Sequence, residues 1–346
     1  MLNILIPCEY SSSSIYLVEI NKCLNSFAST VFDLDKFWGE KGNYQIIYLQ
    51  WPEALFRWNR VFEIDLRRLE NTLTYWKNKC EQIIVTRHNT FPHLLNDSFY
   101  KEVYRIVYKY ADKIIHLGEY SKNEYESIYG SFSWISGQKH YIVPQPFDYN
   151  MCPQNNKKEN ARKKLKIPSS ESIVLVFGSL NRKEDIKLLE YLEKKKDKKY
   201  RFLVARREVP RIVGCRTLKP MLKLYVNLTS NSFNNFDFIP NEDVPYYFNA
   251  ADCVFLPRIN ILNSAVLYHA FSFGKVVVGP SSGNITEILI ATKNPIYDPK
   301  DLKSIDDKIN MGLNLAKENH GLKNYAYATA HWSREIITSL LKNVIY

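Results

Sequence analysis

Short apolar runs alternate with longer segments of helical periodicity along the whole chain. Such runs indicate buried strands, and apolar residues recurring every three or four positions indicate helices that pack one face. The alternation predicts an α/β fold of doubly wound, mostly parallel sheets. In the first half we expect strands near Leu2–Pro7, Tyr44–Gln50, Gln82–His88, Lys113–Leu117 and His140–Pro144, and helices near Ile15–Phe27, Ala54–Lys77, Ser98–Tyr110 and Ser121–Tyr129.

A second α/β unit is expected after Pro144–Asn150, where proline and polar residues interrupt the periodicity. Its pattern predicts a basic helix near Glu159–Leu165, and the stretch Arg211–Ser230 follows neither period and stays unassigned. We therefore predict domains at 1–148 and 149–328, with 329–346 as a final helix. The expected strands lie near Ile173–Phe177, Tyr200–Ala205, Asp237–Ile239, Cys253–Pro257, Lys275–Gly279 and Pro295–Tyr297, and later helices near Leu302–Glu318 and Trp332–Asn343.

Length and composition narrow the class of protein. A chain of 346 residues is about twice a typical domain, which agrees with two domains. Six cysteines are scattered without Cys-x-x-Cys pairs, so we expect neither a zinc site nor disulfides, and a reducing cytoplasm. The first residues lack the basic region and long apolar stretch of a signal peptide, so we expect none, and we expect no segment that spans a bilayer.

The formal net charge of +11 leaves nucleic acid or an anionic membrane surface as partners. Aromatic residues such as Tyr100, Tyr104 and Tyr108 recur at helical spacing with aliphatic ones, which favours core packing over base stacking. We therefore expect no nucleic-acid partner, and a cytoplasmic protein that associates peripherally with the inner face of the membrane. The alternative is that the basic runs are only solvated helix faces.

Two predicted helix starts lie close together in the second half. One follows Arg258 and begins at Asn263 or Ser264, and the other begins just after Gly283, at Asn284. Unpaired N–H groups at two such starts suit a diphosphate, and Arg258 at a strand end adds a fixed cation. The alternative is an ordinary αβα unit in which serine and glycine only cap helices.

Ligands of open α/β sheets bind beyond the carboxyl ends of strands, which selects further candidates. Gly178 and Ser179 form a small-residue turn, followed by Arg182 and Lys183 at a helix start. Arg206 follows the next strand. These cations are candidates for binding phosphate, and a solvated helix start is the alternative.

In the first half, Trp51 and Glu53 follow one strand, and His88, Asn89 and His93 follow another. A histidine or glutamate there can bind an attacking hydroxyl or accept its proton. Trp51 is a platform for stacking on a sugar, or else part of the core. His88 and Asn89 are alternatively capping residues, with His93 on the surface.

These segments resemble glycosyltransferases of the GT-B fold, in particular family 4. Gln50-Trp51-Pro52-Glu53 and Thr86 to His93 look like segments of a bacterial polysaccharide subgroup. Ala270, Gly274, Val276 to Val278, Gly283 and Glu287 match the donor-domain signature of family 4. Ile261 and His269 stand where that signature has two glutamates.

The resemblance implies two Rossmann-like domains that face a central cleft, the first binding an acceptor and the second a nucleotide-diphosphate sugar donor. It places Arg182, Lys183 and Glu287 among the donor-binding residues, and the final helix back on the first domain. It implies a hexosyltransferase without metal or cofactor, acting on a saccharide or polyprenyl-diphosphate-linked acceptor in bacterial surface polysaccharide synthesis. The alternatives are a nucleotide-sugar epimerase of the same fold, or an inactive nucleotide-sugar-binding homologue.

Overall fold

The computed structural model describes residues 2–12, 14–92, 98–147, 157–180, 182–195, 198–207 and 219–346. The chain forms two compact units, one made of Met1–Pro146 with His331–Tyr346 and the other of Phe147–Ala330. The boundaries expected from the sequence were 148/149 and 328/329. Each unit contains one six-stranded sheet, and every strand pairing in both sheets is parallel.

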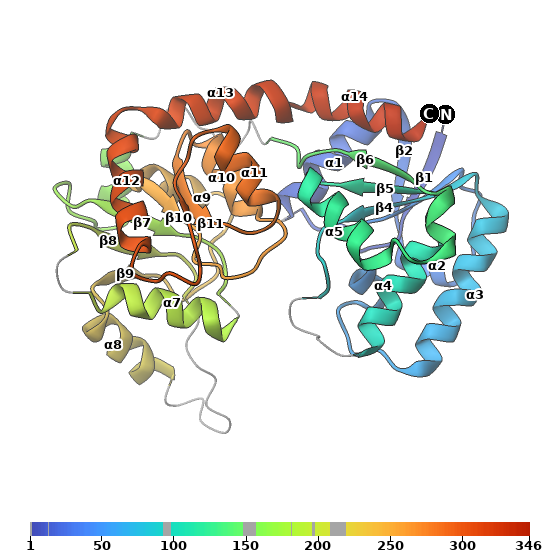
Figure 1. The fold of residues 1–346 in the computed structure, drawn as a ribbon, viewed down its shortest axis with the longest axis horizontal. Helices are drawn as coiled ribbons and strands as arrows, with labels where there is room; N and C mark the ends of the chain where they lie inside the picture. The colour runs from blue at the N-terminus through green and yellow to red at the C-terminus, as the bar shows by residue number, and fades with distance from the viewer. Residues whose placement is uncertain are drawn as a thin grey trace. The chain divides into compact units, whose positions relative to one another are not determined.

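The first sheet has the strand order β2-β1-β3-β4-β5-β6. Because β2 and β3 lie on opposite sides of β1, the winding reverses between β1 and β3. Figure 1 shows helices on both faces of this sheet. The elements are β1 (Leu2–Ile6), α1 (Ile15–Asn25), β2 (Ala28–Phe32), α2 (Leu34–Trp38), β3 (Ile46–Leu49), the 3-10 helix η1 (Pro52–Phe56), α3 (Glu63–Lys79), β4 (Gln82–Arg87), α4 (Ser98–Tyr110), β5 (Lys113–His116), α5 (Glu119–Tyr129), the 3-10 helix η2 (Ser133–Gly137), β6 (Lys139–Ile142) and α14 (Arg334–Ile345).

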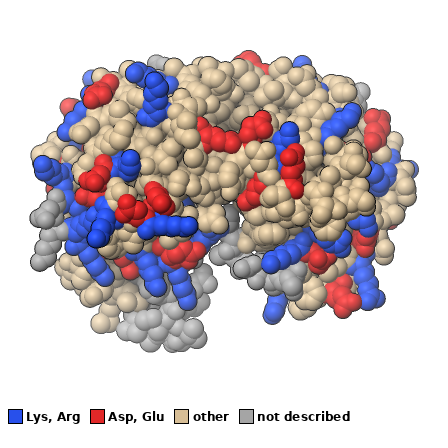
Figure 2. All heavy atoms as spheres, in the orientation of Figure 1, with Lys and Arg blue, Asp and Glu red and all other residues tan. Residues whose placement is uncertain are grey.

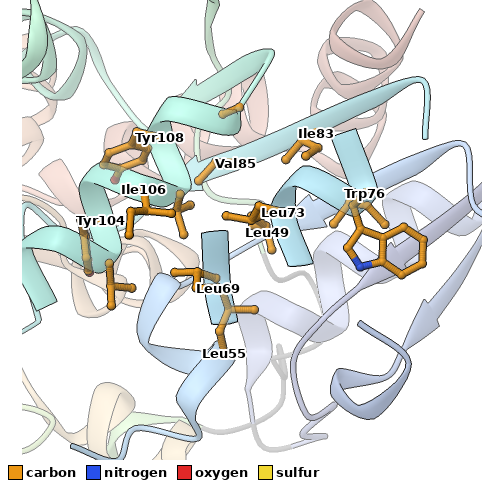
Figure 3. Close-up of a cluster of buried hydrophobic side chains, with 14 of the residues drawn as sticks. Leu49, Leu55, Leu69, Leu73, Trp76, Ile83, Val85, Tyr104, Ile106 and Tyr108 are labelled. Atoms are coloured by element: carbon orange, nitrogen blue, oxygen red, sulfur yellow. The ribbon is translucent and has the colours of Figure 1, made fainter. Parts of the chain in front are cut away.

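Alternation along the strands divides the core of the first unit in two. Ile47 and Leu49 of β3 join a cluster with the α3 and α4 side chains Trp76 and Tyr104 (Figure 3). Ile46 of the same strand joins a second cluster on the other face of the sheet, to which α1 and α14 contribute. Successive side chains of a strand point to opposite faces, so a strand buried on both sides is apolar throughout.

The second sheet has the order β12-β11-β10-β7-β8-β9, so its winding reverses between β7 and β10. Side chains of β7, β8, β10 and β11 pack with those of α7 and α12 in one cluster. The elements are α6 (Lys158–Lys164), β7 (Ile173–Val176), α7 (Lys183–Glu193), β8 (Arg201–Val204), α8 (Lys219–Thr229), β9 (Ser232–Asn234), α9 (Val244–Ala250), β10 (Cys253–Phe255), α10 (Ala265–Ser272), β11 (Val276–Pro280), α11 (Gly283–Ala291), β12 (Ile296–Tyr297), α12 (Ile305–Lys317) and α13 (His320–Trp332).

Three local expectations differ from the structure. The strand expected at Asp237–Ile239 is wrong, because β9 precedes it and the Asn235 side chain accepts a hydrogen bond from the Asp237 N–H at 2.7 Å, which forms a turn. The single helix expected over Ala54–Lys77 is divided into η1 and α3, with Arg57 and Trp58 at positive φ between them. The elements β2, α2 and α13 were not anticipated.

Candidate functional site

The reversal between β7 and β10 in the second unit brings together the loops that follow these two strands. Arg258, after β10, donates from Nη2 to the Ser179 carbonyl, after β7, at 2.9 Å. Gly178 has a φ of 87°, and a Cβ built on it would lie 3.7 Å from the Val266 side chain in the first turn of α10. The β7 loop therefore lies beside the start of α10. A switch point of this kind is the usual ligand site of an open α/β sheet.

The starts of α10 and α11 are joined directly. Ser264 and Ser282 are their N-cap residues, and neither side chain caps its own helix. The Asn284 Nδ2 donates to the Asn263 Oδ1 at 2.7 Å, and the Asn284 N–H donates to the Leu262 carbonyl at 2.9 Å. The first N–H groups of each helix lack partners within their own helix and carry partial positive charge. The pair of helix starts expected from the sequence is thus present in the structure.

Gly283 allows this close approach of the two helix starts. Its φ is 60°, in the left-handed region that other residues rarely adopt. A Cβ at this position would lie 2.2 Å from the Ile261 carbonyl oxygen and 2.5 Å from the Leu262 carbonyl oxygen. Glycine is therefore required both by the backbone conformation and by the space available.

Arg258 has a structural partner that the sequence did not reveal. Its Nη1 lies 2.8 Å from the Asp185 Oδ2, and Asp185 is fully buried in α7. The other Asp185 oxygen accepts the Ile259 N–H at 3.1 Å. Arg258 therefore holds the β7 loop and α7 in place, and its charge is largely neutralised by Asp185.

The other predicted donor-site residues occupy different positions around this switch point. Arg182, the N-cap residue of α7, donates to the Asn260 carbonyl, and the Ser282 hydroxyl donates to the Asn260 side chain at 3.4 Å. Asn260, which sequence reasoning missed, thus links the starts of α7 and α11. The remaining predicted residues are Lys183, exposed at the first position of α7, and Glu287, half-buried in α11.

Arg206 does not join this group in the structure. It is exposed after β8, its φ is 63°, and its guanidinium lies 5.7 Å from the centre of the Phe238 ring. Its neighbour Arg207 forms an ion pair with Glu193 at 2.6 Å. Within the described part of the chain, both arginines make their contacts with α7, β9 and Phe238, away from the loops that carry Gly178 and Gly283.

In the first unit, an aromatic group lies at the carboxyl ends of β3 and β4. The rings of Trp51 and His88 stack with centroids 4.2 Å apart, and Tyr16 meets both rings edge-on. The Gln50 Oε1 accepts hydrogen bonds from the Tyr16 hydroxyl at 3.2 Å and the His88 Nε2 at 3.0 Å, which assigns the His88 proton to Nε2. Burial lowers the pKa of His88 to about 3, so its imidazole is neutral at neutral pH.

Glu53 lies in the core beneath this group. It is fully buried in η1, where its carboxylate accepts hydrogen bonds from the Tyr104 hydroxyl at 2.7 Å and the Asn89 amide at 3.2 Å. Burial raises the pKa of Glu53 above its ordinary value. The structure therefore places Glu53 next to Asn89 but beneath the surface. His93 lies outside the described residues. Tyr16 and Gln50 complete the group and were not anticipated.

Within the described ranges, no cluster of three or more histidine, cysteine, aspartate or glutamate residues is suited to holding a metal ion. In the same part of the chain, no helix has both the length and the apolar character needed to cross a bilayer.

Two doubly wound α/β units, each built on one six-stranded parallel sheet, define the GT-B class of glycosyltransferase fold. Residues 157–329, which make up half of the chain, match the model of the glycosyl transferases group 1 family. The chain belongs to this family.

Solved structures show the same fold at low sequence identity. Sucrose-phosphate synthase from Thermosynechococcus elongatus aligns with a TM-score of 0.72 and 14% identity, covering 100% of this chain and 98% of that chain. HepE of Anabaena, in complex with UDP, aligns with a TM-score of 0.70 and 13% identity, and the alignment covers 100% of this chain and 99% of HepE. A trehalose-6-phosphate structure from E. coli bound with UDP-2-fluoro glucose aligns with a TM-score of 0.68 and 10% identity, and the alignment covers 99% of each chain. The search of curated proteins found no match.

Proposed function

We propose that the second unit binds a nucleoside diphosphate sugar, with the diphosphate at the joined starts of α10 and α11. The observation that carries this proposal is the Asn263–Asn284 hydrogen bond, which fixes two helix starts side by side at the switch point. The HepE structures contain UDP and UDP-glucose, which supports a uridine nucleotide as the first donor to test.

The chemistry follows from the charge that develops during transfer. As the glycosidic bond breaks, the diphosphate gains negative charge, and preorganised N–H groups and cations stabilise that charge without reorganising. In this proposal the backbone N–H groups at the starts of α10 and α11, from Ser264 and Gly283 onward, bind the diphosphate, and Arg182 and Lys183 supply cations. Asn284 holds the two helix starts together through its hydrogen bonds to Asn263 and Leu262. Because these groups neutralise the leaving diphosphate, the transfer of a hexosyl group needs no metal ion.

Several other residues support the donor site. Arg258 and Asp185 hold the Gly178–Ser179 loop, as their hydrogen bonds to that loop and to residue 259 indicate. Glu287, one turn into α11, is assigned to the sugar, as the family 4 resemblance implies. Arg206 would need a change of orientation to reach the diphosphate, so we give it a secondary role.

On the acceptor side, we propose that the stacked rings of Trp51 and His88 bind a sugar of the acceptor. A neutral imidazole orients the attacking hydroxyl by hydrogen bonding, and the low pKa of His88 makes it a weak base. Glu53 then acts as a positioning residue that holds Asn89, and His93 remains a predicted acceptor contact. The acceptor we infer is a saccharide or a polyprenyl-diphosphate-linked saccharide of bacterial surface polysaccharide synthesis.

Calorimetry with UDP and GDP tests the donor site. Arg182→Ala and Lys183→Ala should each weaken affinity, because each lost charge-assisted hydrogen bond costs on the order of 1.5 to 3 kcal/mol. Lys187→Ala is the matched control, since Lys187 is also exposed on α7 but lies one turn further from the helix start. Unchanged affinity in both test variants would exclude this placement of the diphosphate.

Product analysis separates transfer from the two alternatives. Incubation with a panel of nucleotide sugars and acceptors should give a new glycosidic bond, which NMR spectroscopy detects. An altered sugar configuration on the nucleotide without acceptor would identify an epimerase. Nucleotide-sugar binding with neither product would identify an inactive homologue.

We further infer that the protein is cytoplasmic and docks peripherally on the anionic inner face of the membrane. The support is the net charge of +11 and the surface of the second unit. Figure 2 shows lysine and arginine side chains gathered over α7 on the visible face of that unit. On α8, Met221, Leu224, Tyr225 and Leu228 share one helix face and are 60% to 76% exposed, and we call this set the α8 face.

A further inference from the structure

A pocket of about 280 Å³ opens at the amino ends of the strands of the second sheet. Ser172, Asp252 and Lys275 line it, and each directly precedes a strand, namely β7, β10 and β11. The proposed donor site uses the loops that follow these strands. Since parallel strands share one direction, the pocket and the donor site lie at opposite edges of the sheet. The pocket is therefore a separate site within the second unit.

The end of α12 and the start of α13 form another wall of this pocket. Gly321, in the first turn of α13, packs directly on the turn before β11, because a Cβ at Gly321 would lie 1.8 Å from the Gly274 carbonyl oxygen. Leu313 of α12 and Leu322 of α13 add apolar lining. The backbone contact between the two glycines leaves no room for a side chain, so any substitution at Gly321 would displace this wall.

The charge of the lining is predominantly positive. Lys158, Lys275 and Lys317 line the pocket together with a single carboxylate, Asp252. Both oxygens of that carboxylate are engaged within the protein, because Lys158 pairs with its Oδ1, and Oδ2 accepts from the Arg162 Nη2 at 3.0 Å and from the Ile173 N–H at 2.6 Å. The positive charges of the lining outnumber the negative ones, which favours an anion over a cation in this pocket.

Lys275 is the central group of this pocket. Its Nζ donates to the Ala251 carbonyl at 2.8 Å, which uses one of the three donors of an ammonium group. The pKa of Lys275 is lowered to about 8, mainly by burial, with Asp252 opposing this shift and the charges of Lys158 and Arg162 adding to it. A bound anion would supply the counter-charge that this amine lacks.

We propose that this pocket binds a small phosphate monoester, with the phosphate between Lys275, Lys158 and Lys317. A dianion matches the three ammonium groups, and the volume exceeds what a bare phosphate ion fills. The apolar side chains of Leu313 and Leu322 then contact the carbon skeleton of the ester. This inference does not depend on the glycosyltransferase function proposed above.

Calorimetry on the full chain tests the site with glycerol 3-phosphate, inorganic phosphate and uncharged glycerol. We expect glycerol 3-phosphate to bind, phosphate to bind more weakly and glycerol not to bind. Lys275→Met and Lys317→Gln should each weaken binding of the ester roughly tenfold or more. Lys323→Gln is the matched control, because Lys323 is exposed on α13 but does not line the pocket.

Affinity for UDP, measured on the same variants, should be unchanged, which separates this site from the donor site. If Lys275→Met does not fold, the exposed Lys317→Gln decides the question. The proposal is wrong if glycerol 3-phosphate does not bind the wild-type chain, or if both lysine variants bind it normally. Equal affinity for phosphate and its ester would contradict the assignment to an ester.

Discussion

At the scale of single residues, Gly283 has the most demanding environment in the proposed donor site. Gly283→Ala would place a Cβ 2.2 Å from a carbonyl oxygen at a φ of 60°, so α11 must shift. We expect the free energy of unfolding to fall by about 1 to 3 kcal/mol. We also expect UDP to bind more weakly, because the start of α11 is displaced. Chemical denaturation measures the first effect and calorimetry the second.

Gly137→Ala is the matched control for this substitution. A Cβ on Gly137 would meet no atom within 4 Å, so stability and nucleotide binding should stay at the wild-type level. If Gly283→Ala were as stable as Gly137→Ala, the close approach of α11 to residues 261 and 262 would be wrong.

His116 makes stability depend on pH. Its Nδ1 meets the Ser121 hydroxyl at 3.1 Å, its Nε2 meets the His140 Nδ1 at 3.0 Å, and burial followed by the nearby Arg87 charge lowers its pKa to about 2. Below pH 6.5, the ordinary pKa of histidine, His116 is protonated in the unfolded chain but stays neutral in the folded chain. The contribution of His116 to the free energy of unfolding is therefore complete above about pH 6.5 and falls by about 1.4 kcal/mol per pH unit below it.

Urea titrations at pH 7 and pH 5.5 measure this dependence. His116→Gln should reduce the loss of stability between the two pH values, because the imidazole that resists protonation is gone. His331→Gln, at an exposed position, controls for the removal of an imidazole. An unchanged loss in His116→Gln would show that other groups cause the pH dependence.

Some residue-level predictions needed only the local sequence, and others depended on distant partners. Ser264 and Gly283 were predicted at helix starts from local residue preferences, and both lie there, although the Ser264 side chain makes no capping hydrogen bond. Arg258 was expected to offer its charge to a ligand, but it pairs with Asp185, 73 positions away in the sequence. Glu53 follows a strand as expected, yet its burial depends on Tyr104 of α4, which no local pattern reveals.

At the scale of elements, α14 illustrates how a helix at the end of the chain stabilises the first unit. Ile337, Leu341 and Val344 are fully buried in a cluster shared with α1 and the sheet, and Arg334 pairs with the buried Glu19 of α1 at 2.8 Å. Leu341→Ala should lower the free energy of unfolding by about 2 to 5 kcal/mol.

Thermal and denaturant unfolding check this value, with Ile336→Ala as the control. Ile336 lies on the same helix and is 37% exposed, so its truncation should cost less than about 1 kcal/mol. An equal loss of unfolding free energy in both variants would mean that α14 does not pack on α1 and the sheet through Leu341.

Periodicity predicted elements well where one pattern dominated. The strands β1, β4, β5, β7 and β11 lie where continuous apolar runs were found, because strands buried on both faces carry an unambiguous signal. The stretch Arg211–Ser230 could not be assigned from its periodicity, and the structure describes α8 within it. Its Met221, Leu224, Tyr225 and Leu228 face solvent and Leu222 and Val226 are only half-buried, so the helix lacks the usual single buried apolar face.

At the scale of the whole chain, the doubly wound class and the GT-B fold were predicted and are confirmed. In the second unit the sequence candidates lie at the switch point between β7 and β10, because small polar turns follow those strands. In the first unit they follow β3 and β4, one strand away from the reversal between β1 and β3. The sequence did not lead to the pocket beside Lys275. That pocket is lined by five separate stretches of the sequence, between residues 158 and 322, and its lysines look like ordinary solvated charges when read singly.

The last prediction concerns the membrane. Each lysine or arginine close to an anionic surface contributes about 1 kcal/mol, reduced by salt over a Debye length of roughly 8 Å. Co-sedimentation with vesicles should therefore rise with anionic lipid content and fall with added salt. The α8 face adds apolar contact, and Lys223 on the same helix lies over the Phe236 ring, 5.3 Å from its centre. Replacing Leu224 and Leu228 with glutamate should weaken vesicle binding several-fold, because it removes apolar contact and adds negative charge.

Ile64→Glu is the control for that change, since Ile64 is 70% exposed on α3 and belongs to no comparable apolar face. Wild-type vesicle binding by the Leu224→Glu, Leu228→Glu variant would exclude the α8 face as the docking surface. The sequence offers no groove-binding helix with base-edge donors, so affinity for duplex DNA should be slight at physiological salt. Tight DNA binding at that salt, without vesicle association, would overturn the membrane assignment. Nucleic acid would then be the anionic partner that the net charge of +11 attracts.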